Sequence, residues 1–340
     1  MGNTSIPLRY RASRMVETTR IIVQSPSRIH CGLLNETGQF GFVDGGFGFS
    51  LDAPCWNLEI NVGGTGRRGL PLCTEHEQAI DQVLSLLCDQ FGHLDVSIIV
   101  HSQIPAHVGL GSKTSLLLAV GRSFCELVDL HLNHVELAQI LGRGGTSGIG
   151  VYSTMKGGYI RDAGHRYPEE KSCFGPSSMQ LSTPPRLLFR SPVEWMYVVH
   201  FRFADIGVYG EREKWLFSEF CPISENETKT ILRLTDEYVD QAIHSRDERR
   251  LQYGISQLQN VGFKKVEWDH QEAITKEFRS YWLGLDAPYA LGLSSTGPTL
   301  YCISSKPASV LDLVNGFGSP PLHCNVSSIS NTGLIIAKKG

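Results

Sequence analysis

Apolar residues recur along the chain at spacings typical of strands and helices. β-favouring, partly alternating runs predict strands over 56–62 and 94–104, and helical spacing predicts a helix between them over 75–91. A third β-favouring stretch, 21–34, is interrupted by Pro26 and predicts a strand, a kink and a second strand. Because these patterns interchange along the chain, they predict a fold that mixes α and β structure.

A helix with one buried face is predicted from residue 112 onward. Apolar residues return there at steps of three and four positions. Gly121 interrupts the pattern and indicates close packing against a neighbouring element. Asn133 and Glu136 have the spacing of a capping box and predict the start of another helix. The residues that form the apolar face are Leu117, Val120, Phe124 and Leu127.

The C-terminal part of the chain repeats the mixture. A strand is predicted near 194–203, two long helical stretches over 224–245 and 249–268, and a turn between short strands within 289–303. A further helix and two strands then complete an α+β lobe. The expected organisation is an N-terminal arm (1–21), an N-terminal domain (22–165), a proline-rich linker or lid (166–192) and a C-terminal domain (193–340).

Composition narrows the class of protein. The 340 residues are 41% hydrophobic and 19% charged, which is typical of a globular protein. The formal charge of −3 and the lack of a basic cluster argue against nucleic-acid binding. The longest apolar run, LLLAV, is too short for a membrane span, so a cytoplasmic location is expected. Nine scattered cysteines without a CxxC pair predict reduced thiols.

The glycine turn that precedes the helix at 112 is the strongest candidate for a binding site. Gly109 and Gly111 flank Leu110 and allow a ligand to approach the main chain. The helix would then begin at Ser112, so that its unpaired amides and its positive dipole end face the turn. Lys113 and Thr114 add a cation and a hydroxyl group. The turn is therefore predicted to bind an anion.

Two further polar turns have suitable composition for anion contacts. They are Gly145-Thr146-Ser147 and Ser294-Ser295-Thr296-Gly297, although the second is also typical of a plain hairpin. Asp44, within a glycine-rich stretch, has two interpretations: it binds ribose hydroxyls or a magnesium ion, or it caps the turn. Arg28 and His30, two residues apart in a predicted strand, share a face.

Several motifs together resemble a known family. PAHVGLGSKT (105–114) resembles the P-x-x-x-G-L-G-S-S/G motif of the GHMP kinase superfamily. The stretches 25–35, 42–54, 142–165, 260–268 and 292–303 are similar to the β-ribofuranosylaminobenzene 5′-phosphate synthase branch, over roughly residues 22–340. The resemblance implies an α+β, two-lobed GHMP kinase-like fold. It also implies transfer of phosphoribosyl from phosphoribosyl pyrophosphate (PRPP) to an aromatic or heteroaromatic carboxylic acid, with loss of carbon dioxide and pyrophosphate.

The chain departs from related kinases at two positions. Those kinases have an aspartate after SGI that helps activate the acceptor hydroxyl, and this chain has Gly150. Many have a second serine in the glycine turn that helps hold magnesium, and this chain has Lys113, which we expect to contact the pyrophosphate directly. Both departures argue against phosphoryl transfer to an alcohol.

The resemblance implies Mg²⁺ as the cofactor and a site in which His165, together with Arg28 or His30, grips the acceptor carboxylate. A structural role for His165, with its ring bonded to backbone, is the alternative. Magnesium would neutralise the departing pyrophosphate. The lid (166–192) is expected to order only with substrate. An ATP-dependent small-molecule kinase and a catalytically inactive binding protein remain as alternatives. Two questions stay open. The acceptor is either a benzoate-type acid of pterin-cofactor synthesis or a pyrazole acid of C-nucleoside antibiotic synthesis, and the protein is either a monomer or a homodimer.

Overall fold

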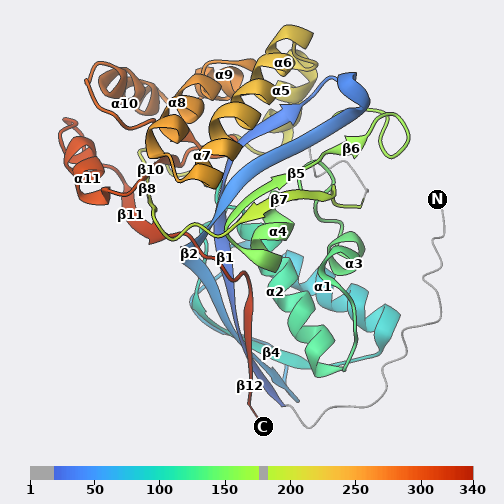
Figure 1. Ribbon diagram of the computed structural model, residues 1–340. Helices are drawn as coiled ribbons and strands as arrows, with labels where there is room; N and C mark the ends of the chain where they lie inside the picture. The colour runs from blue at the N-terminus through green and yellow to red at the C-terminus, as the bar shows by residue number, and fades with distance from the viewer. Residues whose placement is uncertain (1–18, 176–182, 340) are drawn as a thin grey trace.

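The computed structural model describes residues 19–175 and 183–339, so most of the predicted N-terminal arm and residues 176–182 of the predicted lid lie outside the described residues. Two lobes share a pair of long strands, β1 and β2, which run from the bottom of the molecule to its top (Figure 1). The strand and helix bounds of the N-terminal lobe are β1 Arg20–Asn35, a 3-10 turn Gln39–Gly41, β2 Phe42–Val62, β3 Gly66–Gly69, α1 Thr74–Phe91, β4 Val96–Ser102, α2 Ser112–Leu127, α3 His134–Ile140, α4 Ile149–Lys156, β5 Tyr159–Asp162, β6 His165–Arg166 and β7 Leu187–Ser191.

The C-terminal lobe consists mainly of helices around a small sheet. Its elements are β8 Tyr197–Arg202, α5 Gly210–Phe220, α6 Glu225–Leu234, a π-helix Thr235–Asp240, α7 Gln241–Ser245, α8 Glu248–Leu258, α9 Gly262–Asp269, α10 Ala273–Leu283, β9 Gly292–Leu293, β10 Leu300–Ser304, α11 Pro307–Asn315, β11 His323–Ser328 and β12 Ile335–Lys339. The two helical stretches expected over 224–245 and 249–268 are each broken into shorter helices.

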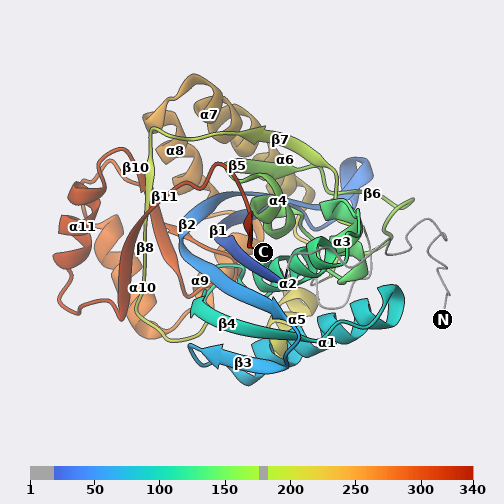
Figure 2. The same cartoon turned by 90° about the horizontal axis from the view of Figure 1, so that it is seen from below.

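Among the described residues, eight strands form the main sheet with a central order β12-β1-β2-β4-β3. β5 and β6 also pair with β2, and β7 pairs with β5. Leu187–Ser191, which the sequence assigns to the linker or lid, are thus a strand of this sheet. The four-stranded sheet of the C-terminal lobe has the order β11-β8-β10-β9. Figure 2 shows the two sheets side by side, with α1 to α4 grouped on one side of the main sheet.

The kink predicted at Pro26 is present. The pairing of β1 with β2 changes register between Pro26 and Ser27, and again between His30 and Gly32. These irregularities bend the strand at the segment that carries Arg28 and His30. The half of β1 before Pro26 therefore belongs to the main sheet, and the half after it, with Arg28 and His30, can line the space between the lobes.

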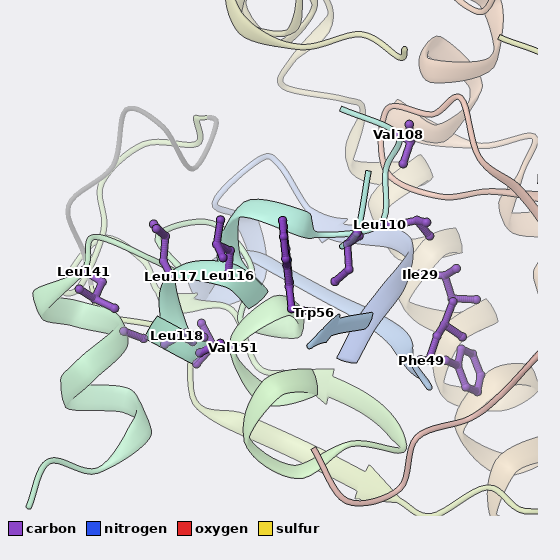
Figure 3. Close-up of a cluster of buried hydrophobic side chains, with 14 of the residues drawn as sticks. Ile29, Phe49, Trp56, Val108, Leu110, Leu116, Leu117, Leu118, Leu141 and Val151 are labelled. Atoms are coloured by element: carbon purple, nitrogen blue, oxygen red, sulfur yellow. The ribbon is translucent and has the colours of Figure 1, made fainter. Parts of the chain in front are cut away.

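The buried face of α2 fills the core between the main sheet and its helices (Figure 3). Leu117, Val120, Phe124 and Leu127 are all at most 4% exposed, as the apolar pattern predicts. A Cβ atom on Gly121 would lie 2.9 Å from Leu141, which explains the glycine at this position. The indole of Trp56 donates a hydrogen bond to the carbonyl of Ser112 over 3.0 Å. The start of α2 is thereby fixed to β2.

Candidate active site

A cavity of about 560 Å³ lies between the lobes, where the glycine turn before α2 faces the first turn of α5. β1, the 143–150 loop and the 295–297 turn complete its walls. The structure brings most of the predicted site residues to this wall: Arg28, His30, Gly109, Leu110, Gly111, Ser112, Lys113, Thr114, Thr146, Ser147, Ser295, Thr296 and Gly297. It places the other four outside the lining: Asp44, Gly145, His165 and Ser294.

The glycine turn requires its two glycines. Gly109 and Gly111 have φ angles of +80° and +75°, in the left-handed region. A Cβ atom on Gly109 would lie 2.4 Å from the Ser294 carbonyl oxygen, and one on Gly111 would lie 3.1 Å from the Arg28 side chain. α2 begins at Ser112, so the amides of its first turn have no acceptor within the helix and face the cavity. This geometry is suited to binding an anion.

The Ser112 side chain, in contrast, forms its hydrogen bonds within the protein. Its hydroxyl donates to the Ile104 carbonyl over 2.8 Å, and the Nε2 atom of His76 lies 2.8 Å from the Ser112 hydroxyl oxygen. Burial lowers the pKa of His76 to about 4, so the ring is neutral and its Nε2–H is the donor. Ser112 therefore offers its main-chain amide to a ligand rather than its hydroxyl group.

Arg28 is a buried cation in the cavity wall beside the glycine turn. Its Nη1 donates to the Gly109 carbonyl over 2.5 Å, and its backbone amide donates to the Leu110 carbonyl over 3.1 Å. Its Nε atom is buried without a hydrogen-bond partner in the described part of the chain. Burial lowers the pKa of the guanidinium to about 10, which leaves it charged at neutral pH. A buried cation in this state has capacity for an anionic ligand.

Arg143 is a second cation on the same wall and was not predicted. Its Nε and Nη2 atoms donate to the Thr114 hydroxyl over 3.1 and 2.7 Å. Burial lowers its pKa, and the positive charge of Arg143 in turn contributes to the lowered pKa of Arg28. Within residues 19–175 and 183–339, neither arginine forms an ion pair with a carboxylate. The basic residue in GRGGTSG is the one sequence signal for Arg143.

Ser294 and His30 join the two lobes. The Ser294 hydroxyl donates to the Gly109 carbonyl over 2.7 Å and accepts from the His30 amide over 3.0 Å. The Ser295 amide donates to the His30 carbonyl over 2.9 Å. Burial, with a contribution from Arg28, lowers the pKa of His30 well below its usual value, so its ring is neutral. Ser294 thus positions the glycine turn from outside the lining of the cavity, and the substrate contact predicted for it stays a prediction.

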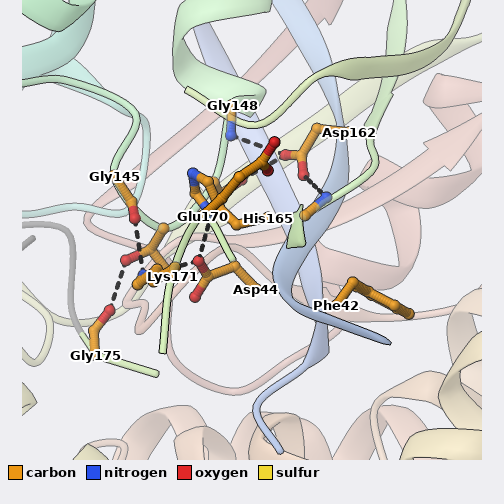
Figure 4. A network of polar contacts seen from close by, with 12 residues as sticks. Phe42, Asp44, Gly145, Gly148, Asp162, His165, Glu170, Lys171 and Gly175 are labelled. Carbon is orange, nitrogen blue, oxygen red and sulfur yellow. Dashed lines mark hydrogen bonds and ion pairs between the residues drawn. The ribbon is translucent and has the colours of Figure 1, made fainter. Parts of the chain in front are cut away.

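Asp44 and His165 belong to a buried network behind the 144–148 loop (Figure 4). His165 Nδ1 lies 2.6 Å from an oxygen of Asp44, and Lys171 Nζ lies 2.7 Å from the same oxygen. Lys171 also donates to the Gly145 carbonyl over 2.8 Å. Asp162 accepts from the amides of Gly148 and Gly164. The network supports the second glycine turn from its far side.

His165 makes a second contact, from Nε2 to the Thr183 carbonyl over 2.7 Å. Burial on its own would lower the pKa of His165, but the hydrogen bonds to Asp44 and Thr183 outweigh burial and the pKa is raised. Both ring nitrogens therefore act as donors to protein oxygens. The sequence left two roles open for His165, a grip on the acceptor carboxylate and a structural role in which the ring bonds to backbone. The contacts to Asp44 and to the Thr183 carbonyl favour the structural role. Lys171, in a segment without a motif, could not have been found from the sequence.

α5 provides the wall opposite the glycine turn, which no sequence motif predicted. Tyr209, Glu213 and Phe217 line the cavity from this helix and the residue before it. The ring of Tyr209 stacks on His107 from the N-terminal lobe, with centroids 3.9 Å apart. Burial raises the pKa of Glu213 to about 7, with Arg28 acting in the opposite direction. Glu267, also in the lining, has a pKa raised by burial to about 7 and pairs with Lys264.

Gly150 lines the cavity at the start of α4. A Cβ atom at this position would lie 3.2 Å from the Thr114 side chain. Glycine therefore stands at the sequence position that the motif assigns to an aspartate in related kinases. The described residues contain no group of three or more His, Cys, Asp or Glu side chains that could hold a metal ion. No helix in the described ranges is long and apolar enough to cross a membrane.

The GHMP kinase architecture is confirmed by comparison with known proteins. Residues 78–158 match the model of the GHMP kinases N-terminal domain. The structure is similar to homoserine kinase from Cytophaga hutchinsonii, with a TM-score of 0.65 at 12% identity and coverage of 96% and 99% of the two chains. It is also similar to mevalonate diphosphate decarboxylase from Staphylococcus aureus, with a TM-score of 0.60 at 13% identity and coverage of 95% and 100%. At these identities the likeness shows the fold alone.

Sequence relatives define the family more closely. The β-ribofuranosylphenol 5′-phosphate synthase of Archaeoglobus fulgidus is 34% identical over 92% of this chain and 98% of its own. The synthase of the same name from Methanocaldococcus jannaschii is 33% identical over 84% and 90%. The chain belongs to the β-ribofuranosylphenol 5′-phosphate synthase family of the GHMP superfamily, and it is an enzyme of the ribosyltransferase class. The family predicted from the motifs is confirmed, while the names of the relatives specify a phenol product.

Proposed function

We propose that this enzyme transfers the phosphoribosyl group of PRPP to an aromatic or heteroaromatic carboxylic acid and releases pyrophosphate and carbon dioxide. The observation that carries the proposal is the pair of arginines, Arg28 and Arg143, which line the cavity without a carboxylate partner in the described ranges. PRPP has two separate phosphate groups, and the acceptor adds a carboxylate. A cavity with two cations that lack a carboxylate partner among the described residues, and with several glycine turns, has the charge for such a ligand set.

The glycine turn before α2 would hold the pyrophosphate. The first-turn amides of α2 and the positive end of its dipole face the cavity there, and Lys113 lies beside them with a side chain 41% exposed. Arg28 Nε, buried without a partner, lies against Gly111 in the same wall. Stabilisation of the pyrophosphate as a leaving group would lower the barrier to breaking its bond to C1 of ribose.

Gly150 favours ribosyl transfer over kinase chemistry. Phosphoryl transfer to an alcohol generally uses a group that orients or deprotonates the hydroxyl, and this position lacks one. In the proposed reaction a ring carbon of the acceptor attacks C1, and the bond to the carboxyl group breaks to restore aromaticity. Positioning by Arg28 and the neutral His30 would then be the main contribution of this part of the wall.

Mg²⁺ is proposed as the cofactor. It usually retains several waters and binds substrate phosphates together with one or two carboxylates. Glu75 is a suitable carboxylate in the lining: burial raises its pKa, but Lys113 and His107 outweigh burial and the net pKa is lowered, so it is ionised at neutral pH. The ion would supply charge neutralisation for the departing pyrophosphate.

The experiment that tests the function has two stages. Calorimetry with PRPP and with ATP, each with Mg²⁺, should show binding of PRPP and little turnover of ATP. A panel of benzoate-type and pyrazole-type acids with PRPP should then show pyrophosphate release and a product mass that lacks the carboxyl group. ATP hydrolysis with a phosphorylated product would instead establish a kinase, and PRPP binding without pyrophosphate release under any acceptor would indicate a binding protein.

A further inference from the structure

α5 presents an acidic and an aromatic side chain to the cavity on one face. Glu213 and Phe217 are four residues apart in this helix, and both line the cavity. Phe217 is 8% exposed and is held by a stacked contact with Phe263, at 4.4 Å between centroids, and by an edge contact with Phe174 at 5.1 Å. The result is a rigid apolar surface with a carboxyl group one helical turn away. A flat aromatic ligand with a polar substituent matches this arrangement.

Glu213 differs from the other carboxylates of the cavity wall. Glu75 is paired with Lys113 and His107, and Glu267 is paired with Lys264. In the described part of the chain, no side chain or amide forms a hydrogen bond or an ion pair with the Glu213 carboxyl group. Arg28 and Glu267 are the charged groups that interact with it through space. Its hydrogen-bonding capacity is therefore available to a ligand.

We propose that Glu213 binds an O–H or N–H group of the acceptor ring, one conjugated with the carbon that bears the carboxylate, and takes its proton while that carbon attacks ribose. This inference rests on the proposed function, and it narrows the acceptor to aromatic acids that carry such a donor. The relatives from Archaeoglobus and Methanocaldococcus are named for a phenol product, a ring with an O–H group of this kind. A pyrazole acid with a ring N–H satisfies the same requirement.

The step balances without another reactant. The ring carbon forms its bond to C1 as the bond from C1 to the pyrophosphate oxygen breaks, and the donor O–H or N–H passes its proton to the Glu213 carboxylate. The ring is then neutral and no longer aromatic: it is a dienone from an O–H donor, an imine from an amino donor, or a ring with an N=N bond from a pyrazole N–H. When the bond to the carboxyl group breaks, carbon dioxide leaves, its electron pair restores the aromatic ring, and Glu213 returns the proton. A carboxyl group whose pKa is raised by burial to about 7 can take up and release a proton near neutral pH.

The matched control lies on the same helix. Glu211 is 89% exposed and pairs with Lys214, so Glu211→Gln changes the same charge without reaching the cavity. We would compare the parent enzyme, Glu213→Gln, Glu213→Ala and Glu211→Gln, after verifying that all melt at similar temperatures. The probes are 4-hydroxybenzoate, 4-aminobenzoate and pyrazole-3-carboxylate, each with its O- or N-methylated counterpart that lacks the donor hydrogen.

The binding experiment does not depend on turnover. The parent enzyme should bind at least one donor acid about tenfold or more tightly than its methylated counterpart. Glu213→Ala should lose this preference and Glu211→Gln should retain it, whereas Glu213→Gln keeps an oxygen that accepts a hydrogen bond and serves the kinetic experiment. If the parent prefers none of the donor acids, or if Glu213→Ala keeps the preference, the inference is wrong. If the preference behaves as expected but no pyrophosphate is released from PRPP, the proposed function fails and the assignment of the ligand contact stands.

The kinetic experiment tests proton transfer itself. Glu213→Gln should lower kcat with the preferred donor acid by about a hundredfold or more, as expected for loss of a positioned general base, and should leave the Kd for PRPP within about twofold. Its pH–rate profile should also lose the limb near pH 7 that the parent shows. Unchanged kcat in Glu213→Gln, or an equal loss in Glu211→Gln, would overturn the catalytic role.

Discussion

Lys113 Nζ lies 3.0 Å from a carboxylate oxygen of Glu75 at the edge of the cavity. The other oxygen of Glu75 lies 2.5 Å from His107 Nε2, so one carboxylate holds two basic groups of the wall. The sequence predicted that Lys113 contacts the pyrophosphate, and the structure places this side chain in the lining with a partner of its own. A ligand anion must therefore share or replace Glu75 as the partner of Lys113.

Replacement of Lys113 by Met tests this contact. Met retains most of the apolar stem and removes the charge, and a charge-assisted hydrogen bond contributes roughly 1.5–3 kcal/mol. We expect PRPP binding to weaken by about ten- to a hundredfold with the fold intact, measured by calorimetry and thermal melting. Lys214→Met, which removes a cation that pairs with Glu211 outside the cavity, is the control and should bind normally. PRPP affinity equal to that of the parent would place Lys113 away from the ligand.

Gly150→Asp restores the carboxylate of related kinases at a position that lines the cavity. We expect no kinase activity, because the new charge would face Thr114 and the Arg143 that binds it, where the proposed substrate is anionic. PRPP affinity should fall by about tenfold or more through like-charge repulsion. Gly150→Ala separates charge from volume, since its Cβ makes the same close approach to Thr114, and it should lose much less affinity. A phosphorylated product from ATP with Gly150→Asp would contradict this interpretation of the glycine.

Removal of the Asp44 charge should affect stability much more than binding. Asp44→Asn leaves Lys171, with a side chain 3% exposed, as a buried cation without its carboxylate, which should cost about 3–5 kcal/mol in the free energy of unfolding. PRPP affinity of the folded variant should change little, because neither residue lines the cavity. Chemical denaturation and calorimetry give the two values. A full loss of PRPP binding at unchanged stability would instead support the substrate-binding role predicted for Asp44.

The loss of unfolding free energy caused by His165→Asn should depend on pH. The folded-state pKa of His165 is raised, so its contribution to stability is complete below the unfolded pKa of about 6.5 and is lost as pH rises through the folded pKa. The variant should therefore be more destabilised at pH 6 than at pH 9, as measured by denaturant unfolding at both values. A catalytic role would instead appear as a fall in kcat with an unchanged melting temperature at both pH values.

Glu36 should make the protein less stable as the solution becomes alkaline. It is 2% exposed, and burial raises its pKa to about 8, with Glu267 and Asp44 adding to the increase and Lys264 opposing it. A raised carboxyl pKa means that the folded state binds more protons than the unfolded state, so stability falls between about pH 4.5 and pH 8. Glu36→Gln should reduce this fall by roughly 1–3 kcal/mol. An identical pH dependence in the variant and the parent would show that Glu36 is ionised in the folded state.

The local parts of the site could be predicted from the sequence. Gly109 and Gly111 adopt positive φ angles next to a helix that begins at Ser112, and each of these features depends on neighbouring residues alone. The kink at Pro26 and the capping box at Asn133 were predicted for the same reason, and both are present. The family resemblance extended these local motifs to the correct fold.

The remaining residues of the site depend on contacts between distant segments. Glu213 lies in EREKWLF, whose pattern is that of an ordinary surface helix, and only the approach of α5 to the glycine turn places it in the cavity. His165 has the residue type of a catalytic group, but Lys171 and Asp44 surround it from segments that the sequence could not place beside it. Arg143 reaches the wall because Thr114, 29 residues earlier, accepts its hydrogen bonds.

β12 pairs antiparallel with β1, so that Arg20 lies opposite Lys339. The start of the first described strand and the finish of the last are thus neighbours on one edge of the main sheet (Figure 1). A short hairpin loop could join them, and new termini could be opened in an exposed connection such as 70–73, between β3 and α1. The strand that carries Arg28 and His30 would then become an internal segment of a circularly permuted enzyme, with both cavity walls still on one chain.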